Sequence, residues 1–233
     1  INPSDPELSG LKSGILSLIN DKSGTLWIST EKGLFSYEPM SNLFFNETLN
    51  GLIGKEAPIQ CMEHGLEELW ILTESDLIRI PSSGEDPTAY SITFEEENTY
   101  INSLFIDRNN RIWLKTNHGL YTYDTDSRSA DLIIGTTHTT RSLMLNPVEP
   151  LAEDKDGYIW YGTFGDGLFK IHPETKEYLL YTNNPADPLS LSENAINCLY
   201  EDRSGVLWCG TFGAGISILD PQANKFNLFK HDP

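Results

Sequence analysis

The sequence predicts an all-β protein, a β-propeller of four-stranded antiparallel blades in which five blade repeats are present. Five tryptophans recur along the 233 residues in steps of 43, 43, 47 and 48, at Trp27, Trp70, Trp113, Trp160 and Trp208. Four of them lie in similar decapeptides: DKSGTLWIST at 21–30, DRNNRIWLKT at 107–116, DKDGYIWYGT at 154–163 and DRSGVLWCGT at 202–211. The copy around Trp70, EHGLEELWILT at 63–73, is degraded. A repeat of this length, with tryptophan flanked by apolar residues, is typical of one propeller blade.

Each repeat divides into four short strands. In the first repeat we expect strands at 15–19, 26–30, 34–37 and 42–45, and in the last at 196–200, 206–211, 216–219 and 225–229. An Asp-x-x-Gly sequence between the first two strands predicts a type I-like turn, in which Asp accepts backbone hydrogen bonds and Gly takes the left-handed conformation. Consecutive apolar residues such as Leu26, Trp27 and Ile28 predict a sheet that is covered on both faces by neighbouring sheets.

The repeats divide one propeller segment, residues 1–233, into blades at approximately 11–46, 57–95, 99–135, 141–182 and 194–230. The segment 2–9 resembles the connecting loop at 184–190, and residues 231–233 resemble the start of another such loop. We therefore expect five whole blades of a larger ring, of about seven blades, cut from a longer protein. Closure of a ring by five blades alone is the alternative.

Composition excludes several classes of partner. The formal net charge is −18 and the isoelectric point is near 4.5, which disfavours binding to nucleic acid or to anionic membrane surfaces. No apolar run is long enough to span a bilayer, so we expect membrane attachment only through a segment outside this chain.

Three cysteines are too few for a disulfide scaffold or a zinc site. If residues 202–205 form a four-residue turn, Cys198 faces Cys209 across the hairpin, within reach of a bond. The favoured interpretation is that both are small buried apolar residues.

The succession of a D-x-x-G turn, apolar-Trp-apolar, Gly/Ser-Thr and Gly-Leu is similar to the two-component regulator propeller repeat. The best matches are DKDGYIWYGTFGDGLFKI at 154–171 and DRSGVLWCGTFGAGISIL at 202–219. The resemblance covers nearly the whole chain and is weakest in the second repeat. It implies a periplasmic sensor domain of a bacterial membrane histidine kinase or hybrid two-component regulator. Ligands of that family are typically oligosaccharides, and its rings commonly have seven blades.

Positions that differ between blades are the candidate ligand-binding residues. A ligand on the propeller axis would contact the turns between second and third strands and the loops that join blades. Side chains there are aromatic, amide and charged, as sugar recognition requires; ordinary solvated loop residues are the alternative for each one. The candidates are Glu31, Lys32, Tyr100, Asn117, His118, Arg141, Phe164, Asp166, Glu193, Asn194 and Phe212.

The repeated residues are expected to be structural. The position of the tryptophans in the middle of a strand favours a packing role over sugar stacking. Four aspartates recur at one turn position, which favours capping over catalysis: Asp21, Asp107, Asp154 and Asp202. The sequence DKDG at 154–157 lacks the further ligands of a calcium loop, so no metal and no cofactor are expected.

The function expected from the sequence is non-enzymatic recognition of an oligosaccharide or another small ligand, by a sensor that forms a homodimer in the parent receptor. Catalytic motifs for acyl or phosphoryl transfer and for metal-dependent hydrolysis are absent from the sequence. Two alternatives stay open. One is a carbohydrate-active enzyme with paired carboxylates at the axis; the other is a protein-interaction scaffold.

Overall fold

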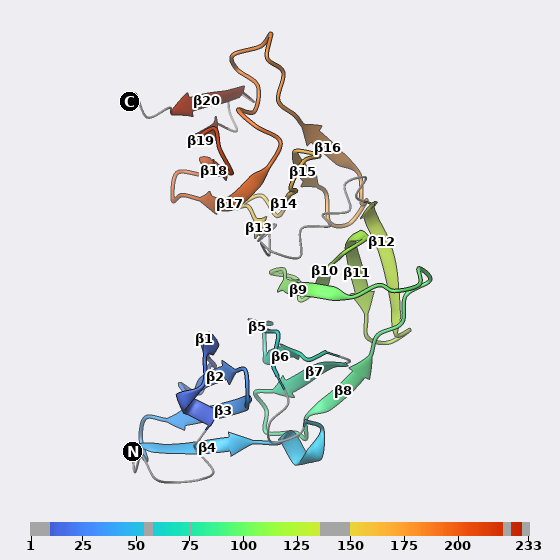
Figure 1. Ribbon diagram of the computed structural model, residues 1–233. Coiled ribbons are helices and arrows are strands. Elements are labelled where there is room, and N and C mark those ends of the chain that lie inside the picture. The colour runs from blue at the N-terminus through green and yellow to red at the C-terminus, as the bar shows by residue number, and fades with distance from the viewer. Residues whose placement is uncertain (1–9, 54–57, 75, 136–149, 221–224, 230–233) are drawn as a thin grey trace. The chain divides into compact units, whose positions relative to one another are not determined.

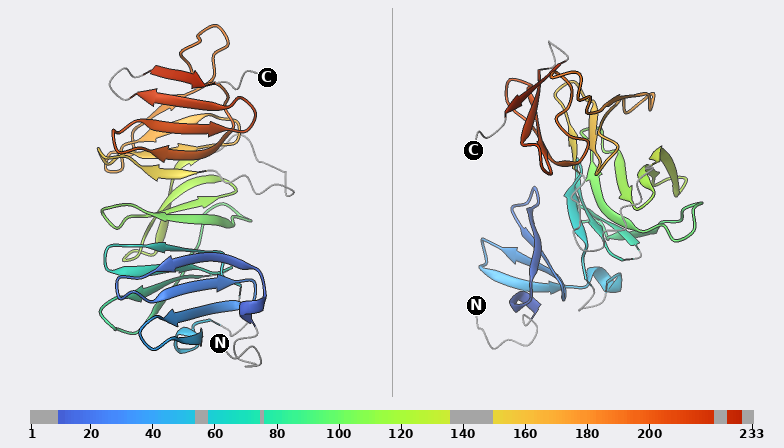
Figure 2. Two further views of the ribbon diagram at one scale, coloured as in Figure 1. Left: turned by 90° about the vertical axis from the view of Figure 1, so that its left-hand side faces the viewer. Right: turned by 45° about the horizontal axis from the view of Figure 1, so that its top comes forward.

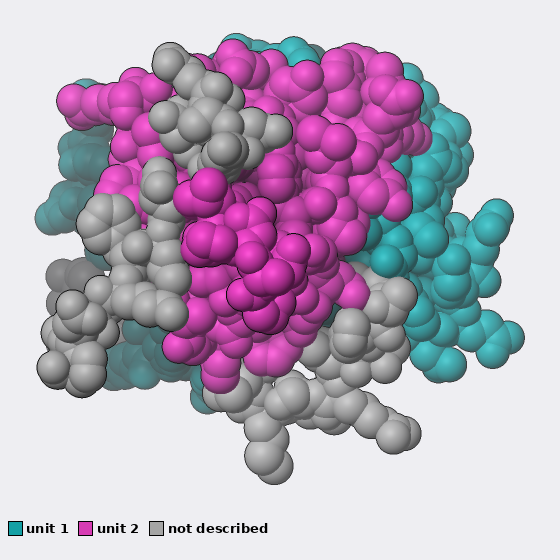
Figure 3. All heavy atoms as spheres, turned by 90° about the horizontal axis from the view of Figure 1, so that it is seen from above, with its two compact units in different colours: residues 1–135 teal, residues 136–233 magenta. Residues whose placement is uncertain are grey.

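The computed structural model describes residues 10–53, 58–74, 76–135, 150–220 and 225–229 and contains five four-stranded antiparallel sheets (Figures 1 and 2). In every sheet the strands follow one another in chain order, so each sheet is one blade of a β-propeller. The predicted fold class is confirmed. The chain divides into two compact units, residues 1–135 and residues 136–233 (Figure 3).

The first unit contains three blades. The strands of the first blade are β1 (Ile15–Asn20), β2 (Leu26–Thr30), β3 (Gly33–Glu38) and β4 (Leu43–Glu47), and a 3-10 helix, η2 (Leu49–Gly51), follows. The second blade has β5 (Cys61–His64), β6 (Glu68–Leu72), β7 (Asp76–Pro81) and β8 (Thr88–Ser91). The third has β9 (Ile101–Ile106), β10 (Ile112–Thr116), β11 (Gly119–Asp124) and β12 (Ser129–Gly135).

The second unit contains two blades. The fourth blade has β13 (Leu151–Glu153), β14 (Ile159–Gly162), β15 (Leu168–Ile171) and β16 (Tyr178–Tyr181). The fifth has β17 (Ile196–Glu201), β18 (Leu207–Thr211), β19 (Ile216–Asp220) and β20 (Lys225–Phe229). The strands predicted for the first and last repeats therefore form within one or two residues of the expected positions.

The aspartate of each Asp-x-x-Gly turn binds both the backbone of the turn and the indole of the tryptophan that follows. In the first blade the carboxylate of Asp21 accepts hydrogen bonds from the backbone N–H groups of Ser23 (2.9 Å) and Thr25 (3.0 Å) through Oδ1. Its Oδ2 accepts from the indole Nε1 of Trp27 at 2.8 Å. Gly24 has φ +87°, the left-handed conformation that the turn requires. The expected capping role of the aspartate is therefore observed, and the same carboxylate also satisfies the indole N–H.

The aspartate–tryptophan bond recurs in the third, fourth and fifth blades, and in the third it forms although Asn110 replaces the turn glycine. The donor–acceptor distances are 3.1 Å for Trp113 to Asp107, 2.8 Å for Trp160 to Asp154 and 3.0 Å for Trp208 to Asp202. The constant spacing of six residues between Asp and Trp is the sequence signal for this bond. Because the carboxylate is occupied by the turn and the indole, these aspartates have a structural role.

Trp27 and Trp160 each pack against the blade that follows. Trp27 shares a buried cluster with Met62, Ile71 and Ile78 of the second blade. Trp160 shares one with Ile196, Leu207 and Cys209 of the fifth. Trp27, Trp70, Trp113 and Trp160 are 8%, 2%, 0% and 2% exposed and are core residues, as the sequence predicted, whereas Trp208 of the fifth blade is 37% exposed.

The carboxylate of Asp202 is expected to titrate below the ordinary aspartate pKa of about 3.9. Hydrogen bonds from the Ser204 hydroxyl and the Trp208 indole to the charged form lower the pKa of Asp202. A lowered folded-state pKa stabilises the fold above the unfolded-state pKa, and that contribution is lost as the pH falls through the folded value. Carboxyl NMR titration should show this midpoint, and Trp208→Phe, which deletes one donor, should raise it. An unchanged midpoint in that variant would contradict the assignment.

The pairing of Cys198 with Cys209 was wrong. The turn of the last blade is one residue longer than the four-residue turn assumed, since Glu201 pairs with Leu207. Cys198 therefore lies opposite Gly210, and Cys209 lies opposite Leu199. Both cysteines are free thiols, Cys209 buried and Cys198 exposed, so burial of both is also corrected.

In the described part of the chain, no helix has the length and apolar character needed to cross a membrane. Within the same residues, no group of three or more His, Cys, Asp or Glu side chains is arranged to hold a metal ion.

Candidate functional site

The turns between second and third strands share one anchoring device. A threonine at the end of the second strand donates its hydroxyl to a carbonyl across the turn, as Thr30 does to Gly33 at 3.1 Å and Thr163 to Gly167 at 2.8 Å. The same hydroxyl oxygens accept backbone N–H groups of the turn, from Lys32 at 3.1 Å and Asp166 at 3.0 Å. The backbone of each turn is thereby fixed, and only its outward side chains vary from blade to blade.

In the second unit these turns are one residue longer and bring two phenylalanines together. Phe164 follows β14 and Phe212 follows β18, and their rings meet edge to face with centroids 5.3 Å apart. Phe212 is 57% exposed. A backbone bridge between Phe164 and Ala195 and a hydrogen bond of 3.0 Å from Phe212 N to Ala195 O attach both turns to the loop before β17. The pair is therefore held rigidly although one ring is open to solvent.

Polar groups from the same loop border this aromatic pair. The carboxylate of Glu193 accepts a hydrogen bond from Gly213 N at 2.7 Å. Asn194 accepts from Asn183 N through its side chain at 2.6 Å and from Gly167 N through its carbonyl at 3.1 Å. Of the predicted residues, the structure thus brings together Phe164, Phe212, Glu193, Asn194 and Asp166 at the ends of two adjacent blades.

In the first unit the predicted residues lie in separate turns and loops. One of them, Asn117, makes hydrogen bonds that hold a loop in place. The amide of Asn117 accepts from Tyr100 N at 2.9 Å and donates to Asn98 O at 3.1 Å, so both of its ends hold the loop before β9. The Tyr100 side chain is 54% exposed. His118 is half-buried in the neighbouring turn position.

The remaining candidates add little to a site. Glu31 and Lys32 are exposed in the turn of the first blade, where the backbone N–H of Glu31 donates to Gly14 O at 3.1 Å. Arg141 lies outside the described residues.

Among the carboxyl groups of the described residues, burial raises the pKa of two, which lie in different units. Burial raises the pKa of Glu63, on β5, to about 7. It also raises the pKa of Glu201, on β17, whose carboxylate accepts the backbone N–H of Lys155. Sequence reasoning did not single out Glu63, because nothing in its neighbourhood resembles a catalytic motif.

The fold is a repeat β-propeller, and the Phe164–Phe212 pair is an aromatic surface on its turns with the ring of Phe212 exposed. Residues 190–213 match the model of the two component regulator propeller family, which confirms the resemblance found in the sequence for this part of the fifth blade. A search of curated proteins found no match.

Two of the solved structures similar to this chain have TM-scores above 0.5 and show the same fold at low sequence identity. The chain is similar to virginiamycin B lyase from Staphylococcus aureus (12% identity, TM-score 0.60, 94% of this chain and 70% of that one). It is also similar to PorZ of the type-IX secretion system of Porphyromonas gingivalis (18% identity, TM-score 0.57, 87% and 31%). A third is described as the extracellular domain of a hybrid two component system from B. thetaiotaomicron (21% identity, TM-score 0.42, 92% and 35%). The chain spans about a third of the length of that domain.

Proposed function

We propose that this chain is the ligand-sensing, non-enzymatic propeller segment of a two-component sensor, that it lies in the periplasm, and that it recognises a carbohydrate. The two component regulator propeller match supports the sensor class. The observation that supports a sugar ligand is the Phe164–Phe212 pair, a rigid aromatic surface with the exposed ring of Phe212 beside the Glu193 carboxylate. Sugars are bound by aromatic rings that cover their apolar faces and by planar polar groups that pair with their hydroxyls.

The signalling step is part of the same proposal. Ligand binding at the Phe164–Phe212 pair changes the packing of blades or of paired subunits in a homodimer. This change passes through a membrane segment to a kinase. The net charge of −18 favours a neutral ligand over an anionic one and opposes nucleic acid.

Calorimetric titration with a panel of neutral oligosaccharides tests the ligand and its location. We expect binding by the chain and a loss of about tenfold in affinity, roughly 1.4 kcal/mol, for Phe212→Ala, because the exposed ring no longer covers the sugar. Tyr200→Ala is the matched control, since Tyr200 is another exposed aromatic (64%) of the same blade, on β17. Equal affinities of wild type and Phe212→Ala would contradict the site, and absence of binding across the panel would contradict the sugar ligand.

A further inference from the structure

The outermost strand of the fourth blade, β16, has one open edge. Its sheet has the order β13-β14-β15-β16, so β16 pairs with β15 on one side (Figures 1 and 2). On its other side, no strand of the described residues pairs with it. An open edge is a row of backbone donors and acceptors that another strand can use.

The direction of the backbone groups along β16 follows from the hydrogen bond just before the strand. Glu177 O accepts the backbone N–H of His172 at 2.8 Å, so the backbone groups of Glu177 face the neighbouring strand. These groups alternate in direction along an antiparallel ladder. The N–H and C=O groups of Tyr178 and Leu180 therefore point to the open edge. Within the described residues, neither of them makes a backbone hydrogen bond outside its own sheet.

Three successive large apolar side chains of β16 are open to solvent. Tyr178, Leu179 and Leu180 are 52%, 60% and 46% exposed. Successive side chains of a strand point to opposite faces, so this strand is apolar and exposed on both faces of its sheet. Contiguous exposed apolar surface of this kind marks a site of interaction.

The strand is held firmly although it is exposed. The ring of Tyr178 meets Phe169 edge to face, with centroids 5.4 Å apart. The ring of Tyr181 stacks on Trp160, with centroids 5.8 Å apart. Both ends of β16 are thus anchored to the body of the blade, and a partner would lose little binding free energy in ordering the edge.

The sequence of β16 lacks the features that keep edge strands from pairing. Natural edge strands carry charged side chains or proline. The strand β16, with the sequence YLLY, contains neither. The outermost strand of every other blade contains or directly follows such a residue: Glu47 in β4, Pro87 before β8, Asp131 in β12 and Lys225 in β20. Of the five outermost strands, β16 is therefore the one suited to pairing.

A second copy of this chain fits the edge in an antiparallel pairing about a twofold axis. With Leu180 opposite Leu180 of the partner subunit, the two residues exchange both backbone hydrogen bonds, because each directs its N–H and C=O outward. Leu179 then lies opposite Tyr181 of the partner subunit, so apolar side chains meet on both faces. Since the same edge is used by both subunits, the assembly closes at two copies.

Charge also favours a second copy at this edge. The net charge of −18 opposes contact between most surfaces of two copies. Residues 178–184, in contrast, contain no charged side chain. In the pairing about Leu180, the nearest charged residue, Glu177, lies opposite Asn183 of the partner subunit. No like charges are therefore opposed along the contact.

We propose that β16 is the dimerisation edge of this chain and that two copies join their fourth blades into one continuous antiparallel sheet. The inference gives a contact surface to the homodimer of the proposed function, and it rests on the proposed function only for the expectation that two copies pair. No ligand is required for this contact.

Sedimentation velocity of the whole chain at increasing concentration, without ligand, tests the dimer. We expect a monomer–dimer equilibrium in wild type. Leu180→Lys places two like charges opposite each other on the axis and is expected to raise the dissociation constant about tenfold or more. Leu132→Lys is the matched control, because Leu132 is 47% exposed on β12, the outermost strand of the third blade. It adds the same charge and should dimerise as wild type does.

Two outcomes of this experiment would overturn the proposal. One is a wild-type chain that remains monomeric up to the millimolar range, which would leave the edge to an extended segment of another protein. The other is equal weakening of the dimer by both substitutions. The calorimetric titration of the Phe164–Phe212 pair measures sugar binding and not self-association, so failure of the dimer and failure of the sugar ligand are distinguished.

Backbone amide exchange tests the contact without any substitution. The amide of Leu180 points to the open edge, so we expect it to exchange slowly only at concentrations at which the dimer forms. The amide of Leu179 faces β15 and is the internal reference, which should be protected at every concentration. Fast exchange at Leu180 in the dimer would show that another surface joins the two copies and would overturn the proposal.

Discussion

Replacing Trp160 by alanine is expected to lower the free energy of unfolding of the second unit by about 3–5 kcal/mol, the usual cost of truncating a fully buried aromatic residue. Trp160 is 2% exposed and packs against Leu207 and Cys209 of the next blade. Its ring also stacks on Tyr181, with centroids 5.8 Å apart. The substitution removes the contact that joins two sheets, so both blades lose packing. Denaturant unfolding, followed by amide exchange on β14 and β18, measures the effect.

Trp208→Ala is the matched control, because the same repeat position is in a different environment. Trp208 also donates its indole N–H to an aspartate, at 3.0 Å, but it is 37% exposed. Less apolar surface is buried there, so we expect a loss of only about 1–2 kcal/mol. Similar losses in the two variants would mean that the aspartate bond, which both residues make, determines the stability and that packing does not.

Replacing Glu68 by alanine is expected to destabilise the first unit by about 2–4 kcal/mol, because three buried or half-buried donors lose their acceptor at once. These donors belong to Trp70, Asn110 and Arg79. The estimate lies below that for a fully buried ion pair, because the Arg79 side chain is 35% exposed and water can solvate it. Thermal and denaturant unfolding of the variant test the value.

Glu67→Ala provides the control at the adjacent position. Glu67 pairs with Lys22 at 2.6 Å, but the two side chains are 77% and 52% exposed. Exposed ion pairs contribute roughly 0–1 kcal/mol, so this variant should unfold nearly as wild type does. If Glu67→Ala were as destabilising as Glu68→Ala, loss of surface charge would explain both results and the buried network would not.

Local features of the fold could be predicted because each depends on a few neighbouring residues. The strand Leu26–Thr30 and the turn at Asp21 follow from apolar periodicity and from a capping side chain next to glycine. The core position of Trp27, Trp70, Trp113 and Trp160 could be predicted in the same way, because these residues recur at one blade position.

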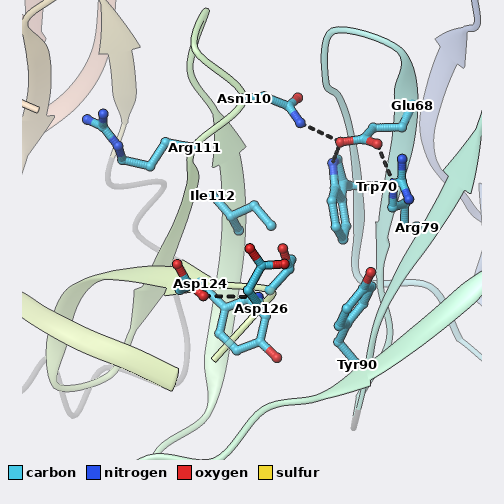
Figure 4. A pocket seen from close by; sticks show the side chains of 11 residues that line it. Glu68, Trp70, Arg79, Tyr90, Asn110, Arg111, Ile112, Asp124 and Asp126 are labelled. Carbon is cyan, nitrogen blue, oxygen red and sulfur yellow. Dashed lines mark hydrogen bonds and ion pairs between the residues drawn. The ribbon is translucent and has the colours of Figure 1, made fainter. Parts of the chain in front are cut away.

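The candidate site could be predicted only in part. Phe164 and Phe212 could be predicted as candidates because their turns vary between blades. Their edge-to-face contact could not, because it depends on how two blades pack. Asn117 was chosen as a ligand residue, yet its amide holds the loop at Tyr100, because the loop folds back to within hydrogen-bond distance. The hydrogen bonds to Glu68 (Figure 4) were missed, although two signals were in the sequence: the degraded turn at 63–68 and Asn110 at the glycine position of its turn.

The sequence by itself determined the class of fold, the order of strands in each blade and the chemistry of the turns, because these depend on interactions within a single repeat. Only the tertiary structure decided the register that separates Cys198 from Cys209, since one residue in a turn shifts every cross-strand partner. It also decided which tryptophans are covered and that Asn110 of the third blade donates to Glu68 of the second. Those features depend on packing between repeats, where residues more than 40 positions apart meet.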